Sequence, residues 1–365
     1  MNSNNTNHNV LSNTISILRF PLILSVVFIH TNLLDVVTKG EPVVNQNDFP
    51  FFYIFQHVLN KELFSIAVPL FFFISGFLFF YKMKGDFDHS VYLSKIKKRI
   101  KTLLIPYIFW NIIVFLLLLL SQIFIPSMMS GKNKLISEYN ITDYINIFWS
   151  HNGWTPICYQ FWFIRDLMVV VLFSPFIYIL AKYLKAYSVF IWITLWFFDL
   201  WTDVPGFSIV SFSFFSIGAW FSLNKSDFTI LLRKLIVPSL FLYVIFIAIS
   251  TLSWYRDNDL YPYLNNLTIV TGIIAIIGSV AYMNSKQKIH PRKTLLDISF
   301  FIYAFHGMPI VFAVKYWVIH MSTSEISLLS GYILCPVVVV TIGFIVYYFL
   351  NKYFNSFTKI ITGDR

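Results

Sequence analysis

Long apolar runs recur along the chain, and short polar stretches that hold most of the charged residues separate them. A bilayer core needs about twenty apolar residues per helix, and the runs are close to that length. The longest polar stretches, 35–61 and 127–159, are too short and too aromatic to form soluble domains. We therefore predict one all-α membrane domain over residues 1–365, a bundle of about ten transmembrane helices. The predicted spans are 14–34, 62–81, 103–126, 160–181, 186–202, 206–223, 234–253, 264–283, 296–319 and 326–350.

Two ionisable residues, Arg19 and His30, interrupt the first apolar run. Hydrocarbon makes such side chains costly, so an intramembrane pair is a candidate functional site. Eleven helical residues return His30 to within roughly 20° of Arg19, displaced by about 16 Å along the axis. Both side chains are therefore predicted to line one stripe of the helix. The alternative is an arginine that reaches the inner interface and a histidine that bonds to a neighbouring helix.

The composition supports a membrane protein, with 57% hydrophobic and 12% charged residues and a mean hydropathy of +0.69. A net charge of +10 can indicate a nucleic-acid partner, but the distribution of the charge indicates membrane orientation instead. Nineteen of the 27 Lys and Arg residues lie in 82–102, 182–185, 225–234, 286–293 and 352–365, which alternating spans place on one side. We predict that this side and both termini are cytoplasmic, in a multi-pass protein of the cytoplasmic (inner) membrane without a nucleic-acid partner.

Several classes of site are not expected from this sequence. Residues 1–13 lack the basic region and cleavage site of a signal peptide, so we expect the first helix to be retained. Cys158 and Cys335 form neither a metal-type cluster nor a disulfide framework. We find no Walker-type phosphate loop. We expect no metal and no permanently bound cofactor, so that any cofactor chemistry comes from a diffusible molecule.

The densest charge cluster follows the second predicted span. It comprises Lys82, Lys84, Lys95, Lys97, Lys98, Arg99 and Lys101. Such a cluster orients a helix and binds anionic headgroups of membrane lipids. It also suits a polyanionic cytosolic donor, such as the 3'-phospho-ADP part of coenzyme A. The run itself does not distinguish the two interpretations.

Five segments, taken in order, carry a resemblance to a known family. They are LRFPLILSVVFIHT at 18–31, VPLFFFISGFLFF at 68–80, KKRIKTLLIPYIFW at 97–110, QFWFIRDLMVV at 160–170 and ISFFIYAFHGMPI at 298–310. Together they resemble acyltransferase family 3, integral-membrane enzymes that modify lipids, peptidoglycan and surface polysaccharides. The resemblance covers most of the chain. It implies that His30 is catalytic and that Arg19 belongs to the same site.

The resemblance also gives the basic cluster an expected role. We expect Arg19, Lys98, Arg99 and Lys101 to bind acetyl-CoA, or another acyl-CoA, as the donor substrate. Members of the family often place a second arginine three residues after the first, where this chain has Thr102. Lys101 is the expected substitute, although lysine offers a point charge rather than the planar fork of an arginine.

Acyl transfer needs a base or a nucleophile together with a group that stabilises the oxyanion. His30 can act as either base or nucleophile. Asp166, about 9 Å inward from the outer end of its span, is the first candidate to fix the His30 tautomer. The alternative is that it pairs with Arg165. Asp48 and Glu62 are further carboxylate candidates, whereas Asp35, five residues after His30, is rotated by about 140° from it and faces elsewhere.

Two further positions carry possible chemistry. His306 lies near the middle of the ninth predicted span. We expect it either to line a donor tunnel or stabilise the oxyanion, or else to form a hydrogen bond within the bundle. Ser75 is an alternative acyl-carrying nucleophile, although Ser75 and Gly76 more simply allow close helix packing.

Two functions are considered for these residues. The first, which the resemblance implies, is a membrane O-acetyltransferase that acts on a surface polysaccharide or its lipid-linked sugar precursor. The second is a transporter or flippase for a lipid-linked or anionic solute, with Arg19, His30, Asp166 and His306 along its path. Transport predicts internal repeats or paired broken helices, and neither is recognisable in the sequence. The ordered motifs therefore favour acyl transfer.

Overall fold

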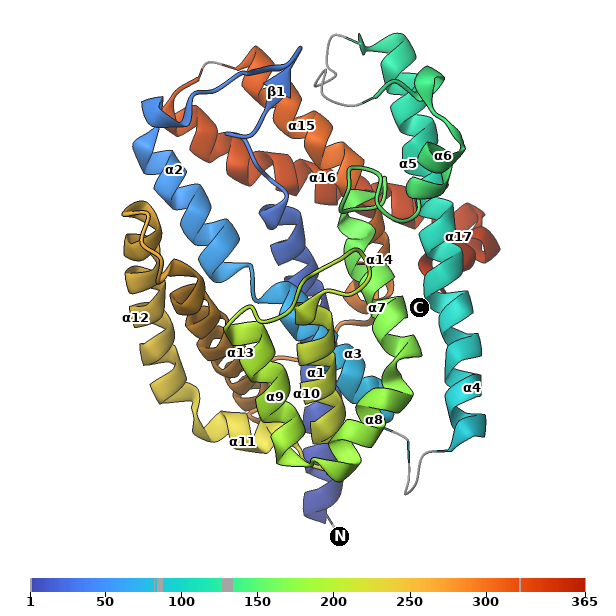
Figure 1. The fold of residues 1–365 in the computed structure, drawn as a ribbon, viewed down its shortest axis with the longest axis vertical. Coiled ribbons are helices and arrows are strands. Elements are labelled where there is room, and N and C mark those ends of the chain that lie inside the picture. Colours follow the sequence, from blue (N-terminus) through green and yellow to red (C-terminus); the bar gives the residue numbers. More distant parts are fainter. Residues whose placement is uncertain (1, 82, 84–87, 127–133, 322, 365) are drawn as a thin grey trace.

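The computed structural model describes residues 2–81, 83, 88–126, 134–321 and 323–364. Figure 1 shows a bundle of helices in which α1 (Asn2–Ile29) runs through the middle. The strands of the described part, β1 (Val37–Thr38) and β2 (Glu41–Pro42), form one antiparallel pair with Val37 opposite Pro42. The all-α class predicted from the apolar runs is confirmed for these residues.

The other helices follow α1 in chain order, and two of the short ones, η2 and η3, are π-helices. They are η1 (Gln46–Asp48), α2 (Pro50–His57), η2 (Val58–Leu63), α3 (Ala67–Phe80), α4 (His89–Arg99), η3 (Ile100–Leu104), α5 (Ile105–Phe124), η5 (Ile136–Glu138), α6 (Ile141–Asn146), η6 (Tyr159–Phe161), α7 (Trp162–Leu172), α8 (Ser174–Tyr183), α9 (Ala186–Phe197), α10 (Ile209–Leu223), α11 (Phe228–Lys234), α12 (Ile236–Tyr255), α13 (Tyr261–Ser285), α14 (Lys293–Phe305), α15 (Gly307–His320), α16 (Glu325–Tyr353) and α17 (Asn355–Thr362).

Six helical runs in the described part are long and apolar enough to cross a bilayer, and two bent helix pairs raise the number to eight. The protein is therefore a multi-pass membrane protein. The predicted spans 186–202 and 206–223 correspond to α9 and α10, which have only 12 and 15 residues. Both are shorter than the roughly twenty residues that a bilayer requires. The number of ten spans stays a prediction.

Two helical runs begin earlier than the sequence predicts. The run that corresponds to the predicted span 62–81 extends from Pro50 to Phe80 through the π-helix η2. The run that corresponds to the predicted span 103–126 extends from His89 to Phe124 through η3. Residues 50–61 and most of the basic segment are therefore helical rather than loop. A π-turn inserts an extra residue into the helix, and such turns are frequent at functional sites.

The bent pairs correct the expectation that this chain has no broken helices. α7 and α8 meet at 59°, and α14 and α15 meet at 63° on either side of His306. Pro175 and Pro309 lie just after the two breaks, where proline cannot donate the backbone hydrogen bond that would continue the helix. An absence of broken helices therefore no longer counts against transport for this chain.

Glycines allow α3 and α10 to pack backbone to backbone. A Cβ atom on Gly76 would lie 2.0 Å from the carbonyl oxygen of Phe215, and one on Gly218 would lie 2.0 Å from that of Phe73. No side chain fits at either position. The packing role that the sequence suggests for Gly76 is confirmed, and the contact fixes α3 as one wall of the site described below.

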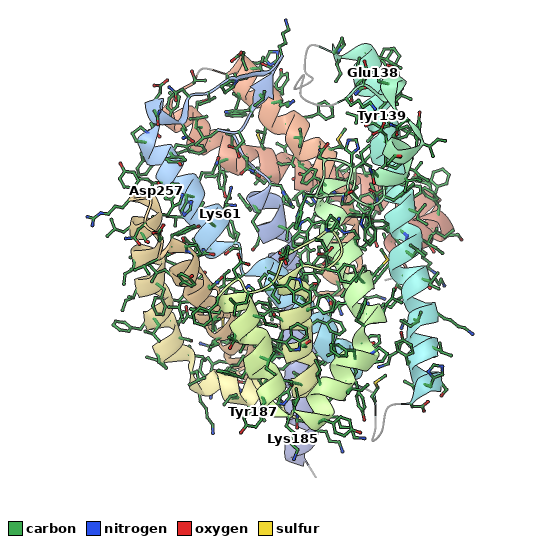
Figure 2. All side chains as sticks on the ribbon, viewed as in Figure 1. Lys61, Glu138, Tyr139, Lys185, Tyr187 and Asp257 are labelled. Carbon is green, nitrogen blue, oxygen red and sulfur yellow. The ribbon has the colours of Figure 1, made fainter. Side chains whose placement is uncertain are left out.

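The polar connections lie at opposite ends of the bundle. Figure 2 places Lys185 and Tyr187 at the end that holds the N-terminus, and Glu138 and Tyr139 at the other end. The C-terminal helix α17 packs against α5. This arrangement agrees with alternating connections, while the cytoplasmic assignment of the basic side and of both termini stays a prediction.

Candidate active site

A cavity of about 750 Å³ lies between α1, α3, α4, α7 and α14. The α1 residues that line it are Arg19, Ile23, Val26 and His30, which recur every three or four residues and so share one face of the helix. His30 is the first residue after α1, and its N–H still donates to the carbonyl of Val26 at 3.3 Å. The structure therefore brings Arg19 and His30 to one space, as their spacing predicts.

One end of the cavity is rich in positive charge. Lys95, Lys98 and Arg99 from α4 line it together with Arg19, and the charges of Arg19 and Arg99 are close enough to interact. Within the described ranges, no ion pair joins Arg19, Lys98 or Arg99 to a carboxylate. Cationic side chains that are not held in a direct ion pair are suited to binding phosphates. Lys82 and Lys84 of the basic segment lie outside the described residues.

Lys101 has a different environment from the other predicted donor-binding residues. Its ammonium pairs with Asp364 at 3.0 Å, and Lys101 is not among the residues that line the cavity. Thr102, at the position of the second family arginine, lines the cavity instead. The structure thus gives no support to Lys101 as the substitute for that arginine. The carboxylates of Asp364 and Asp297 also line the cavity.

His30 lies among aromatic rings. The ring of Tyr159 meets it edge-on with centroids 4.8 Å apart, and the ring of His306 stacks on it with centroids 5.5 Å apart. The Tyr159 hydroxyl donates to the carbonyl of Gly307 at 3.3 Å. The bend between α14 and α15 therefore delivers both His306 and this anchor for Tyr159 to the His30 ring.

His306 is fully buried and supports His30 from outside the cavity lining. Its Nδ1 lies 3.2 Å from the carbonyl oxygen of Ile302. A carbonyl only accepts hydrogen bonds, so Nδ1 carries the hydrogen, and the Nε2 of the neutral ring is left as an acceptor. Among the described residues, this Nε2 has no hydrogen-bond partner. A neutral ring in this tautomer cannot donate from Nε2 to an oxyanion, so its position fits support of His30 better.

Asp166 is not among the residues that line the cavity with His30, and its main partner is its neighbour in the sequence. Its carboxylate accepts hydrogen bonds from Arg165 Nε at 2.9 Å and from the N–H of Gly206 at 3.1 Å. Arg165 in turn donates to the carbonyls of Trp149 and Trp154. The pair therefore joins α7 to two loops, which is the alternative that the sequence left open. Asp166 is not among the cavity-lining residues, so the structure does not bring it to His30.

The other candidate residues are distributed as follows. Asp35 is exposed, Asp48 belongs to the short helix η1, and Glu62 is fully buried in a polar cluster of its own. None of these carboxylates lines the cavity. Ser75, by contrast, lines it from α3. Within the described residues, no group of three or more His, Cys, Asp and Glu side chains could hold a metal ion.

The cavity is also lined by polar residues that were not predicted as site residues, among them Gln160, Tyr303 and Lys95, of which Lys95 was named only as part of the basic cluster. Gln160 donates from Nε2 to the carbonyl of Ala304 at 3.0 Å, and its Oε1 has no partner in the described part of the chain. Tyr303 donates to the backbone carbonyl of Gln160 at 2.6 Å. Lys95 lies one helical turn before Lys98 and Arg99, a spacing that could have identified it.

Comparison with known proteins agrees with this site. The sequence profile of the acyltransferase 3 family, described as an acyltransferase domain, matches residues 13–350. The chain is also similar to the succinoglycan biosynthesis protein ExoH of Rhizobium meliloti (strain 1021), with 24% identity over 361 residues that cover 97% of this chain and 93% of the relative. No solved structure matches the chain. The profile spans every cavity-lining residue except Asp364, and the chain belongs to acyltransferase family 3.

Proposed function

We propose that this chain transfers an acetyl group from cytosolic acetyl-CoA to a hydroxyl group of a surface-polysaccharide sugar or of its lipid-linked precursor. Membership of the acyltransferase family supports the transfer. The similarity to a protein named for succinoglycan biosynthesis supports a polysaccharide acceptor. A donor that is made in the cytosol implies that the protein lies in the cytoplasmic membrane.

A single observation carries the proposal. One cavity contacts the basic residues Arg19, Lys98 and Arg99 and also contacts His30, about 16 Å further along α1. Its volume of about 750 Å³ is in the usual range for ligand pockets. The basic end would hold the phosphates of coenzyme A. The lining between the two ends includes Ile23 and Val26, and it would take the pantetheine arm toward His30.

In the proposed reaction, His30 acts as the general base. It takes the proton from the acceptor hydroxyl while that oxygen attacks the thioester carbon, so that a C–O bond forms. The C–S bond then breaks, and the thiolate of coenzyme A receives the proton back from the imidazolium. The products are the acetyl ester and free coenzyme A. In the alternative that the residues also allow, the acetyl group is carried for a time on His30.

The neighbours of His30 would hold its ring in place. Tyr159 contacts one edge of the ring and His306 stacks on its face. Gln160 lines the same cavity with an amide oxygen that has no described partner. This oxygen could accept a hydrogen bond from the sugar or from the pantetheine amides. We therefore assign His306 and Tyr159 a positioning role and Gln160 a substrate contact.

The test uses the full chain in liposomes with acetyl-CoA labelled in the acetyl group. We expect His30→Ala to lower acetyl transfer by about a hundredfold to ten-thousandfold, the usual contribution of a general base. His290→Ala is the matched control, because His290 is exposed and is not among the cavity-lining residues. Transfer that persists undiminished in His30→Ala would refute the assignment. A burst of free coenzyme A without acceptor, lost in His30→Ala, would select the acetyl-histidine route.

A further inference from the structure

The π-helix η2 lies at the His30 end of α1. Asn60 in η2 donates from Nδ2 to the Oδ1 of Asn32 at 2.9 Å, and Asn32 is two residues beyond His30. The hydroxyl of Tyr332 on α16 donates to the Oδ1 of Asn60 at 2.6 Å. Asn60 is therefore fixed between the end of α1 and α16. The residue that follows it, Lys61, lies beside the proposed acceptor end of the site.

A buried polar cluster fixes the other side of the same π-turn. Glu62 is fully buried, and its carboxylate accepts from the hydroxyl of Ser250 at 2.9 Å and from the amide of Asn265 at 3.3 Å. The Nε2 of His57 lies 3.5 Å from the same carboxylate. Asn265 also donates to the backbone carbonyl of Lys61 at 3.0 Å. Hydrogen bonds within the cluster satisfy the carboxylate of Glu62, and the bond from Asn265 holds the backbone of Lys61 in place.

The side chain of Lys61 is left exposed between these two anchors. Figure 2 shows Lys61 on the part of the α2–η2 run that faces α1. Its charge is close enough to act on the His30 ring. In the described part of the chain, no ion pair joins Lys61 to a carboxylate, not even to the adjacent Glu62. Because it lies within a run long enough to span the bilayer, this charge needs a functional explanation.

We propose that Lys61 binds an anionic oxygen group on the acceptor and so selects acceptors that carry a phosphate or a carboxylate close to the sugar. The inference rests on the proposed function, because it takes the His30 end as the acceptor end. An ammonium held beside the reacting hydroxyl orients the sugar through a charge-assisted hydrogen bond. The phosphate of a lipid-linked precursor and the carboxylate of an acidic sugar share this chemistry.

The test is equilibrium binding of three radiolabelled probes to the full chain in nanodiscs of uncharged lipid. The probes are dodecyl glucoside, dodecyl glucuronide and glucosyl dodecyl phosphate, which differ in charge but share chain length and a pyranose ring. We expect the wild type to bind at least one anionic probe about tenfold or more tightly than the neutral one. The stronger of the two anionic probes identifies the source of the group.

Variants of Lys61 separate this contact from general surface charge. We expect Lys61→Met and Lys61→Gln to lose the preference and Lys61→Arg to keep it. Lys39→Met is the matched control, since Lys39 is an exposed lysine between β1 and β2. Equal binding of all probes by the wild type would overturn the proposal, as would a preference that persists in Lys61→Met or is lost equally in Lys39→Met. Binding needs no acetyl transfer, so the result can be interpreted even if the His30 experiment fails.

Discussion

Two arginines lie within the apolar runs of this chain, and the structure gives them opposite environments. Arg165 is 1% exposed, pairs with Asp166 and donates to two loop carbonyls. Arg19 is only half-buried and lines a cavity, and no ion pair joins it to a carboxylate within the described residues. The same residue type thus closes a structural network at one site and leaves its charge available at the other.

The difference shows what an intramembrane charge does and does not indicate. Both arginines are costly in hydrocarbon, and the general rule makes both candidates for function. The environment separates them, because a charge that protein groups already satisfy has little left to offer a ligand. Arg165 holds the chain together near Trp149, whereas Arg19 lines the cavity without a carboxylate partner among the described residues, which leaves its charge available for the proposed donor.

The largest effect that we predict is on stability, at the satisfied arginine. Arg165→Met leaves the carboxylate of Asp166 buried without its cation, which typically costs about 3–5 kcal/mol. Thermal unfolding of the purified protein, followed by tryptophan fluorescence, should shift clearly to lower temperature. The double variant Arg165→Met/Asp166→Leu should recover most of the loss, since it leaves no unpaired charge.

The variant Asp166→Asn tests whether the Arg165–Asp166 pair is structural or takes part in the reaction. If Asp166 supports His30, as the sequence first indicated, Asp166→Asn should lower acetyl transfer without changing thermal unfolding. If the pair is structural, Asp166→Asn should lower the unfolding temperature, and acetyl transfer per folded molecule should be kept. Lost transfer in a normally stable Asp166→Asn protein would return this carboxylate to the reaction.

Substitution of Arg19 should affect ligand binding more than stability. We expect Arg19→Met to weaken binding of coenzyme A by about ten- to hundredfold, which corresponds to the loss of one charge-assisted hydrogen bond. Thermal unfolding should change little, because Arg19 has no carboxylate partner among the described residues to leave unpaired. Arg19→Lys should lie between the wild type and Arg19→Met, since a lysine keeps the charge but loses the planar fork. Unchanged affinity in Arg19→Met would remove this residue from the donor site.

Much of the fold could be predicted because it depends on local patterns. Apolar run length identified the membrane helices, and the eleven-residue spacing placed Arg19 and His30 on one face. The π-turns and the bend angles could not be predicted from run length. The bends coincide with Pro175 and Pro309, which the sequence shows, but the π-turn at Asn60 has partners far along the chain, such as Tyr332. Such contacts leave no period in the sequence.

The basic segment carries a helical period that its sequence shows. The cavity-lining residues Lys95, Lys98, Arg99 and Thr102 recur every three or four residues, as on one face of a helix. At about 100° per residue, Lys101 is only about 60° from Lys98 but lies roughly 110° from the centre of this face. The helical period therefore includes Lys95 and leaves Lys101 off the face.

The smallest effect that we predict is on coenzyme A binding, and it concerns the exposed lysines Lys98 and Lys101, which lie three residues apart. Lys98 is exposed and lines the cavity, whereas Lys101 is exposed and pairs with Asp364. We expect Lys98→Ala to weaken binding of coenzyme A by about two- to fivefold, as for one exposed charge contact. Lys101→Ala should change it less, and both affinities should be compared at low and high salt. If both variants lose the same affinity for coenzyme A and both losses disappear at high salt, the segment attracts the donor by its net charge and not through a specific contact. A loss confined to Lys98 would place the donor along the helical face that carries Arg99, which has no carboxylate partner of the kind that Arg165 has among the described residues.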